Sequence, residues 1–475
     1  MKNSSLSRNI IYSSIYQILT IITPLITAPY LSRVLGPAGI GQYNYSLACA
    51  NFFFLIAMLG VNNYGNRSIA QAREDKVKVS KIFWEIYGLQ LLLSVICTVT
   101  YVLFSCFLFS GEERFIFLIQ GMVVFAATTD INWFAFGLEK FKYTTVRNII
   151  IKLFTLGCIF LFVNTRNDTW IYIFVTEFGI IMGLLVLWPL VKKELYFIRP
   201  TLKGVFQHLR PNLVLFLPLL ATSIYQYVDK IMLGIYMSDE IVGYYAYAES
   251  ILNIPLGLIN AVCTVAMPRI TNLLSNDNKT DADEIYKKGL FLTSVLEIAI
   301  FWGILAISEK FIPLYLGEEF IETAYILKLL AIVVILLGTA NVVRMMCLIP
   351  KGMDKLYSVS IILGCVGNII GNILLIPKNG YVGACISTIV AYFIVDLIQI
   401  IGSRKILNYG KLFVCLIPFG FLGFFMYMVI KVIDKAILCN PLFLMVVEIT
   451  TGLIIYSGGC IFAMYINKRI LRKRL

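Results

Sequence analysis

The feature that most constrains this chain is the recurrence, from one end to the other, of apolar runs about 20 residues long. Folded as an α-helix, a run of that length crosses the roughly 30 Å hydrocarbon core of a membrane. Because 59% of the 475 residues are hydrophobic and only 14% are charged, polar stretches are too short to form a soluble domain. The sequence predicts an all-α polytopic membrane protein with about 14 transmembrane helices. The runs are 10–35, 41–61, 82–109, 115–137, 147–164, 170–190, 211–236, 241–269, 286–308, 322–349, 356–376, 381–402, 411–431 and 441–466.

Lys and Arg are distributed unevenly between these runs. Most of the 40 basic residues fall in the two terminal segments and in every second connection, including 62–81, 191–210 and 270–285. Basic connections remain on the cytoplasmic side of a membrane, so both termini and these three loops are expected to be cytoplasmic. The formal net charge of +13 has the same origin, because anionic membrane lipids attract short basic loops. A nucleic-acid partner is not expected, since no basic stripe with interleaved aromatic residues is present.

A short motif occurs twice, each time between an odd-numbered run and the next one. Leu-Gly followed by Gly-x-Tyr-x-Tyr stands at 35–45 and again at 233–247. These positions predict two six-helix lobes related by a pseudo-two-fold axis, followed by two added C-terminal helices. The expected divisions are 1–200 for the N-terminal lobe, 201–405 for the C-terminal lobe, and 406–475 for the two added helices and a basic tail.

Residue combinations typical of catalysis and of metal binding are missing from the sequence. The one histidine, His208, stands beside Arg210 in a predicted cytoplasmic loop and is interpreted as a solvated residue. The 11 cysteines are scattered without a CxxC pair and are interpreted as small buried hydrophobes. A P-loop is also missing, so the chain has no ATPase site of its own. We expect no catalytic residues, no metal and no cofactor, and therefore not an enzyme.

Charged residues inside the apolar runs are the candidates for function. A charge at the centre of a membrane helix costs at least roughly 2.5 kcal/mol, so such residues are expected to face a polar cavity, a partner or water. Asp229 and Lys230 are adjacent, point about 100° apart on a helix and need different partners. The acids considered for ion coupling or for lining a cavity are Asp229, Glu249, Glu297 and Glu177.

Some intramembrane charges have a simpler interpretation. Lys328 and Glu448 are expected to lie near an interface, where their side chains extend to the headgroups. Asp130 and Asp396 fit either interpretation. Prolines interrupt the first helix of both predicted halves and one further helix, and each is expected to favour a bend. They are Pro24, Pro29, Pro218 and Pro255.

Three segments carry a resemblance to a known family. They are 29–41 (PYLSRVLGPAGIG), 229–234 (DKIMLG) with the Val-Gly-Tyr-Tyr at 242–245, and 380–388 (GYVGACIST). Together they resemble the signatures of the polysaccharide-unit flippases (Wzx type), within the multidrug/oligosaccharidyl-lipid/polysaccharide exporter superfamily. The segments lie in runs 1, 7–8 and 11–12, so the resemblance covers essentially the whole chain.

The resemblance implies a two-lobed flippase in the bacterial plasma membrane. It would translocate an undecaprenyl-diphosphate-linked oligosaccharide by alternating access, for capsule, exopolysaccharide or O-antigen synthesis. Membrane lipids, a polysaccharide polymerase and a chain-length regulator are the further partners expected. Because Arg and Lys form charge-assisted hydrogen bonds with phosphate, basic side chains are expected along the path of the diphosphate. The candidates are Lys152 and Arg344 near the cytoplasmic side, and Arg33 and Lys230 near the outer side.

Three alternatives stay open at this point. A drug or cation exporter of the same superfamily would have a cavity dominated by acidic and aromatic residues, whereas this chain offers four basic candidates. A lipid II flippase would also carry two added helices, but the segment 29–41 favours the Wzx type. A membrane polysaccharide polymerase would share the composition, yet the short predicted outer loops leave little room for catalytic chemistry.

Overall fold

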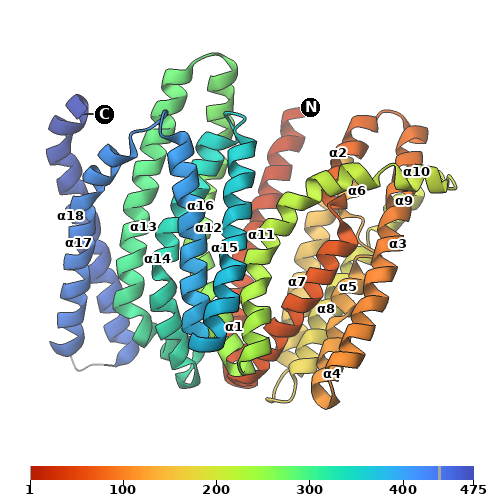
Figure 1. The fold of residues 1–475 in the computed structure, drawn as a ribbon, viewed down its shortest axis with the longest axis horizontal. Helices are drawn as coiled ribbons and strands as arrows, with labels where there is room; N and C mark the ends of the chain where they lie inside the picture. Colours follow the sequence, from red (N-terminus) through yellow and green to blue (C-terminus); the bar gives the residue numbers. More distant parts are fainter. Residues whose placement is uncertain (1, 437–439, 475) are drawn as a thin grey trace. The chain divides into compact units, whose positions relative to one another are not determined.

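The computed structural model describes the backbone of residues 2–436 and 440–474, and the side chains of 22–140, 142–216, 219–220, 222–436 and 440–463. Helices make up nearly all of this described part, in which no strand occurs. The chain divides into two compact units, Met1–Gly243 and Tyr244–Leu475 (Figure 1). The predicted lobes, 1–200 and 201–405, follow the sequence repeat rather than this division, and they stay a prediction.

The first unit contains eleven helices within its described residues, together with the start of α12. They are α1 (Lys2–Met58), α2 (Val61–Ala72), α3 (Lys76–Leu108), α4 (Gly111–Gln120), α5 (Met122–Ala126), α6 (Asn132–Gly137), α7 (Phe141–Phe162), α8 (Thr169–Leu185), α9 (Trp188–Glu194), α10 (Leu202–Phe206) and α11 (Leu209–Tyr236).

The second unit contains most of α12 (Asp239–Ser275) and the remaining helices. They are α13 (Lys279–Leu316), the 3₁₀ turn η1 (Glu318–Phe320), α14 (Ile321–Val343), the π-helical turn η2 (Arg344–Leu348), α15 (Asp354–Asn379), α16 (Tyr381–Ser403), α17 (Tyr409–Ala436) and α18 (Pro441–Arg474).

Eleven helical segments within the described residues are long and apolar enough to cross a membrane. Their outward faces carry large apolar side chains such as Phe107 and Leu161, which is the arrangement that lipid requires. The protein is therefore a multi-pass membrane protein. One of the eleven segments, 22–72, contains the second predicted run and residues 22–35 of the first. The predicted run 211–236 lies in α11, whose side chains are only partly described.

Helix α1 is interrupted at one residue. Gly36 has φ 68° and ψ −179°, a conformation outside the helical region that glycine adopts without the steric cost borne by other residues. Figure 1 shows α1 reversing direction, and Gly36 is the residue at which its φ and ψ leave the helical region. The boundary between the first two predicted runs thus falls at Gly36. Pro24 and Pro29 lie within the preceding helical part, where no such break in φ and ψ occurs.

The predicted run 115–137 is divided into the short helices α4, α5 and α6. At the break between α5 and α6, the carbonyls of Ala127 and Asp130 accept hydrogen bonds from Nε2 of the buried Gln90 on α3, at 2.6 and 2.8 Å. Trp133 Nε1 donates to Oε1 of the same Gln90 at 2.9 Å. One amide from a distant helix therefore satisfies the backbone groups that the break leaves open, which an apolar environment requires.

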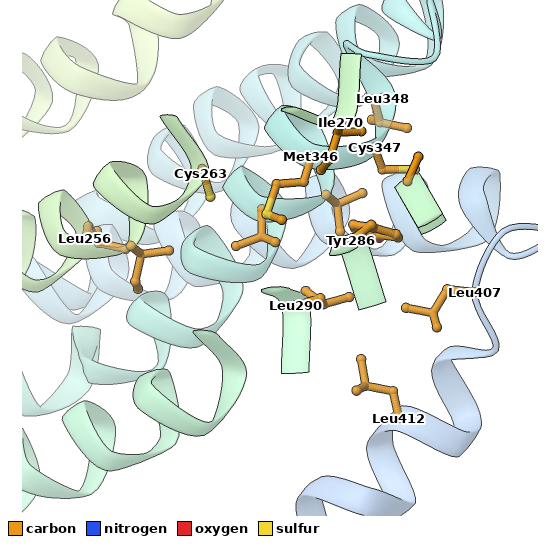
Figure 2. Close-up of a cluster of buried hydrophobic side chains, with 14 residues drawn as sticks. Leu256, Cys263, Ile270, Tyr286, Leu290, Met346, Cys347, Leu348, Leu407 and Leu412 are labelled. Atoms are coloured by element: carbon orange, nitrogen blue, oxygen red, sulfur yellow. The ribbon is translucent and has the colours of Figure 1, made fainter. Parts of the chain in front are cut away.

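In the second unit, α13 packs against α14, α17 and α18. Tyr456 of α18 donates a hydrogen bond to the carbonyl of Val295 at 2.8 Å, which attaches the last helix to α13. Nearer the start of α13, Tyr286 lies in a cluster of apolar side chains from several other segments, including Met346 and Leu412 (Figure 2). Helices α17 and α18 are thus joined to α13 within this unit.

Two Gly-x-x-x-Gly pairs, Gly179 with Gly183 and Gly367 with Gly371, lie where neighbouring helices approach closely. A Cβ on Gly179 or Gly183 of α8 would meet a side chain of α7 at 2.5 Å, and one on Gly371 of α15 would meet Ser387 of α16 at 2.7 Å. Small residues at these positions allow neighbouring membrane helices to approach.

Candidate functional site

The eight residues proposed from the sequence are divided between the two units. Arg33, Lys152, Glu177, Asp229 and Lys230 lie in the first unit, and Glu249, Glu297 and Arg344 lie in the second. Each unit therefore contains both basic and acidic candidates.

Arg33 and Lys230 make corresponding contacts in the two copies of the repeat. Arg33 Nη1 donates to the carbonyl of Pro29 at 2.7 Å, and Lys230 Nζ donates to the carbonyl of Gln226 at 3.0 Å. Each bond reaches back four residues along its own helix. Arg33 is exposed and Lys230 is partly exposed, so both can approach a ligand.

The repeated motif also brings its two copies into direct contact within the first unit. A Cβ added to Gly41 would lie 1.7 Å from the carbonyl oxygen of Asp239, and one added to Gly243 would lie 2.3 Å from that of Pro37. A Cβ on Gly234 would overlap the ring of Tyr45 at 2.4 Å. Glycine is required at these positions because backbone lies directly against backbone or against an aromatic ring.

Lys152 is partly buried in α7, and five residues before it lies a buried arginine that the sequence analysis missed. Arg147 donates to the carbonyl of Gly183 at 3.1 Å and to Oδ1 of Asn132 and Asn148 at 3.1 and 3.0 Å. It thereby connects α6, α7 and α8. Its place at the start of an apolar run made it indistinguishable from an ordinary loop charge.

Glu177 is buried in α8 and belongs to a polar chain across three helices. Its Oε1 accepts a hydrogen bond from Gln120 Nε2 of α4 at 3.2 Å, and Ser46 Oγ of α1 donates to Gln120 Oε1 at 3.3 Å. Asp130, which fitted two interpretations, is also buried, and its Oδ1 accepts from the backbone N–H of Asn132 at 2.9 Å. This hydrogen bond joins Asp130 to the first residue of α6, whose N-cap is Ile131.

His208 corrects an expectation, because its side chain is only 7% exposed rather than solvated. Nδ1 lies 2.8 Å from the hydroxyl of Tyr64, and Nε2 lies 3.4 Å from Oε2 of Glu85 on α3. Burial lowers the pKa of His208 below its usual value of 6.5, although Glu85 acts in the opposite direction. The sequence could not show that α10 packs onto α3, where Gly204 lies against the Glu85 carboxyl, or that His208 lies beside the same carboxyl.

In the second unit, Glu297 lies at the middle of α13 and has no exposed surface. Its Oε2 accepts a hydrogen bond from Thr339 at 3.1 Å, whereas Oε1 has no hydrogen-bond partner among the described residues. A Cβ on Gly338 of α14 would lie 2.6 Å from that Oε1, so the carboxyl rests directly on α14.

Arg344 begins the π-helical turn that follows α14. Its Nη1 donates to the hydroxyl of Tyr357 at 3.3 Å, and its guanidinium lies 5.6 Å from the centre of the same ring. π-Helical turns are rare and frequently occur at functional sites. Glu249 is partly buried in α12 and, like Asp229 in α11, makes interactions with its surroundings.

The interpretation of Glu448 as an interfacial residue is wrong, whereas that of Lys328 stays a prediction. Glu448 of α18 is 1% exposed, and its Oε1 lies 2.7 Å from Lys310 Nζ of α13, which also pairs with Asp434 of α17. Lys328 of α14 pairs with Glu309 of α13. Lys310 thereby joins α13, α17 and α18, and the sequence could not show this pairing because Glu448 lies on a helix distant from Lys310 along the chain.

Two solved structures share this arrangement of helices. A lipid II flippase MurJ in an inward closed conformation matches with a TM-score of 0.73 and 18% identity, covering 97% of this chain and 100% of that one. An inward-facing multidrug resistance MATE family transporter of the MOP superfamily matches with a TM-score of 0.62 and 16% identity, covering 85% and 98%. The chain thus has the fold of this class of membrane transporters, as the sequence predicted.

Sequence comparison then defines the family. A family model described as "Polysaccharide biosynthesis protein" matches residues 6–274, more than half of the chain, and the chain belongs to that family. The "Putative O-antigen transporter" of Escherichia coli (strain K12) is 25% identical over 418 residues, covering 86% of this chain and 99% of the relative. The "Probable low-salt glycan biosynthesis flippase Agl15" of Haloferax volcanii is 25% identical over 252 residues, 52% of each chain. The predicted membership of the Wzx-type flippases is confirmed.

Proposed function

We propose that this protein is a flippase that translocates undecaprenyl-diphosphate-linked oligosaccharide repeat units across the bacterial plasma membrane. The observation that carries the proposal is its membership of the polysaccharide biosynthesis family together with a match over nearly the full length of an O-antigen transporter. The named relatives are transporters and flippases rather than enzymes. The exporter and polymerase alternatives have no comparable support.

The glycine contact suggests how access is closed at one end. The backbone at Gly41 lies directly against the backbone at Asp239. This contact leaves no room for solvent or substrate between the two copies of the motif at that point. Alternating access requires such a contact to form and separate in turn. We expect Gly243→Leu, which would force the copies apart near Pro37, to favour the state that is open at this end.

Four basic residues are proposed to guide the diphosphate. Lys152 and Arg344 would receive it on the cytoplasmic side, and Arg33 and Lys230 would hold it before release outside. Such a charge-assisted contact contributes about 1.5–3 kcal/mol, so losing one should reduce transport roughly tenfold or more. Arg33→Lys should be partly defective and Lys230→Arg better tolerated, because only arginine offers a planar fork. Normal export by both Arg33→Gln and Arg344→Gln, at normal protein levels, would rule this path out.

The orientation and the partners belong to the same proposal. Both termini face the cytoplasm, as the basic connections indicate, and 406–475 forms two helices added to the two lobes. A polymerase and a chain-length regulator would use the repeat units outside. Asp229, Glu249, Glu297 and Glu177 are proposed as acids of the cavity or of ion coupling. Reporters active only outside the membrane should be silent when fused after Asn63 and active after Ser110.

The function itself is tested by deleting the gene. We expect surface polysaccharide to be lost while lipid-linked repeat units accumulate facing the cytoplasm. Accumulation of single repeat units in the outer leaflet would instead identify the protein as a polymerase.

A further inference from the structure

Helix α2 is separated from α1 by a sharp break in the backbone. Leu59 and Gly60 both have positive φ, 40° and 79°, and a leucine rarely adopts such a conformation because of its steric cost. A Cβ on Gly60 would lie 3.0 Å from the carbonyl oxygen of Asn212, so the chain turns directly against the backbone of α11. The break therefore ends the membrane helix and starts α2 as a separate element.

One face of α2 is fixed by contacts with the rest of the first unit. A Cβ on Gly65 would lie 2.5 Å from the ring of Trp133 on α6, and a Cβ on Gly137 of α6 would lie 2.7 Å from a side chain of α2. The hydroxyl of Tyr64 lies 2.8 Å from Nδ1 of His208. A helix held in this way presents its other face in a fixed geometry, which reduces the entropy lost when a ligand binds there.

The opposite face of α2 consists almost entirely of hydrogen-bonding side chains. Four amides and one guanidinium surround a single alanine, and all six positions lie within one half of the helical surface. Five of the six residues are exposed and one is partly exposed, and none of the five polar side chains has a hydrogen-bond or ion-pair partner among the described residues. This amide face comprises Asn62, Asn63, Asn66, Arg67, Ala70 and Gln71.

The composition of the amide face favours one kind of ligand. A helix face in contact with water normally carries Lys and Glu, but Arg67 is the only charged residue of α2. One cation is too few for a polyanion or an anionic lipid surface, and the face has no large apolar side chain to anchor a protein partner. A primary amide both donates and accepts hydrogen bonds, as a hydroxyl group does. The face therefore matches a neutral molecule rich in hydroxyl groups.

Helix α2 also lies at the end of the unit where such a molecule would arrive. Leu59 follows Gly41 by about five helical turns, roughly 27 Å, which is close to the thickness of the hydrocarbon core. The amide face is thus at the opposite end of this helix from the contact between Gly41 and Asp239. Figure 1 shows α2, α6 and α10 together at one end of the first unit. With both termini in the cytoplasm, as proposed, this is the cytoplasmic end.

We propose that the amide face of α2 binds the sugars of the repeat unit at the cytoplasmic end of the protein, through hydrogen bonds between its amides and the sugar hydroxyl groups. The identity of the glycan rests on the proposed function. Binding at α2 does not require translocation, so it can be measured with the free oligosaccharide. The amide face and the basic residues proposed for the diphosphate would hold two different parts of one substrate.

The test uses the repeat-unit oligosaccharide released from the surface polysaccharide of the host, without lipid or phosphate. Its binding to the full-length protein in detergent is followed by saturation-transfer difference NMR. Asn63→Ala combined with Asn66→Ala should weaken binding about tenfold, because two neutral hydrogen bonds are lost. Ala70→Trp should abolish binding by covering the centre of the face. Asn272→Ala on α12 is the matched control, since it removes an exposed asparagine outside the amide face, and binding should be unchanged.

Undecaprenyl diphosphate with and without the repeat unit separates this inference from the proposed function. The wild type should bind the glycan-bearing form more tightly, and the variant with Asn63→Ala and Asn66→Ala should bind the two forms almost equally. A double variant that keeps the preference, or a wild type that binds no oligosaccharide, would overturn the sugar site. A protein that binds the oligosaccharide at α2 but moves no repeat units in proteoliposomes would contradict the proposed function and leave the sugar site intact.

Discussion

Glu297 and Glu448 are two glutamates of the same unit, both almost completely buried, in opposite electrostatic surroundings. Glu448 lies 2.7 Å from Lys310, which also binds Asp434, so its charge is compensated. Glu297 receives one hydroxyl, from Thr339, and no cation. Lys310 and Glu297 are separated by roughly 20 Å along α13 at a rise of about 1.5 Å per residue. The comparison indicates that one region of this helix fixes its neighbours through charge, while the other contains a carboxyl free to change its charge.

The largest expected effect comes from breaking the compensated pair. Lys310→Ala should destabilise the protein by about 3–5 kcal/mol, because it leaves Glu448 and Asp434 as unpaired acids. Thermal unfolding in lipid or detergent measures the change. Lys310→Met combined with Glu448→Met should recover part of the loss, since a buried ion pair replaced by apolar residues is often neutral. An unaffected melting temperature in Lys310→Ala would show that the network contributes nothing.

A smaller effect is expected where α14 supports Glu297. Gly338→Ala should cost about 1–3 kcal/mol, because the new Cβ would lie 2.6 Å from Glu297 Oε1 and force the carboxyl to move. Gly420→Ala on α17 is the matched control, since its Cβ would meet nothing within 4 Å, and it should be neutral or stabilising by up to about 1 kcal/mol. Equal melting temperatures for the two variants would mean that Glu297 does not rest on α14.

Replacing the Glu297 carboxyl itself should change the free energy of unfolding less than Lys310→Ala or Gly338→Ala does. Glu297→Gln keeps the size of the side chain and an acceptor for Thr339, so we expect less than about 1 kcal/mol of change in the free energy of unfolding. Export of polysaccharide should nevertheless fall. A loss of stability as large as that of Lys310→Ala would place Glu297 in the same structural category as Glu448.

The first unit also contains a buried ionisable pair, His208 with Glu85, and its contribution to stability should depend on pH. Since the pKa of His208 is lowered in the folded protein, the unfolded chain binds more protons below pH 6.5. This residue's contribution to stability should therefore be complete above pH 6.5 and be lost as the pH falls toward the folded-state pKa. Melting temperatures of the wild type and His208→Gln across pH 5–8 measure the difference, and parallel curves would contradict it.

The sequence predicted the architecture well because long apolar runs and loop charges are local signals. The predictions from the sequence were wrong where a side chain's hydrogen-bond or ion-pair partner lies on a distant helix. The break in 115–137 depends on Gln90, and the burial of Glu448 depends on Lys310, a residue that local reasoning assigns to a loop. The sequence singled out Glu297 as a candidate acid, but it could not show that Thr339 of α14 would donate a hydrogen bond to it.

The most direct test of the account is transfer by the purified protein. Undecaprenyl-diphosphate-linked repeat units are incorporated into the inner leaflet of proteoliposomes, and their sugars are probed with an oxidant that cannot cross the membrane. The account predicts that the units become accessible from outside only in vesicles that contain the protein, and more slowly with Arg33→Gln. Equal accessibility in vesicles with and without the protein would contradict it.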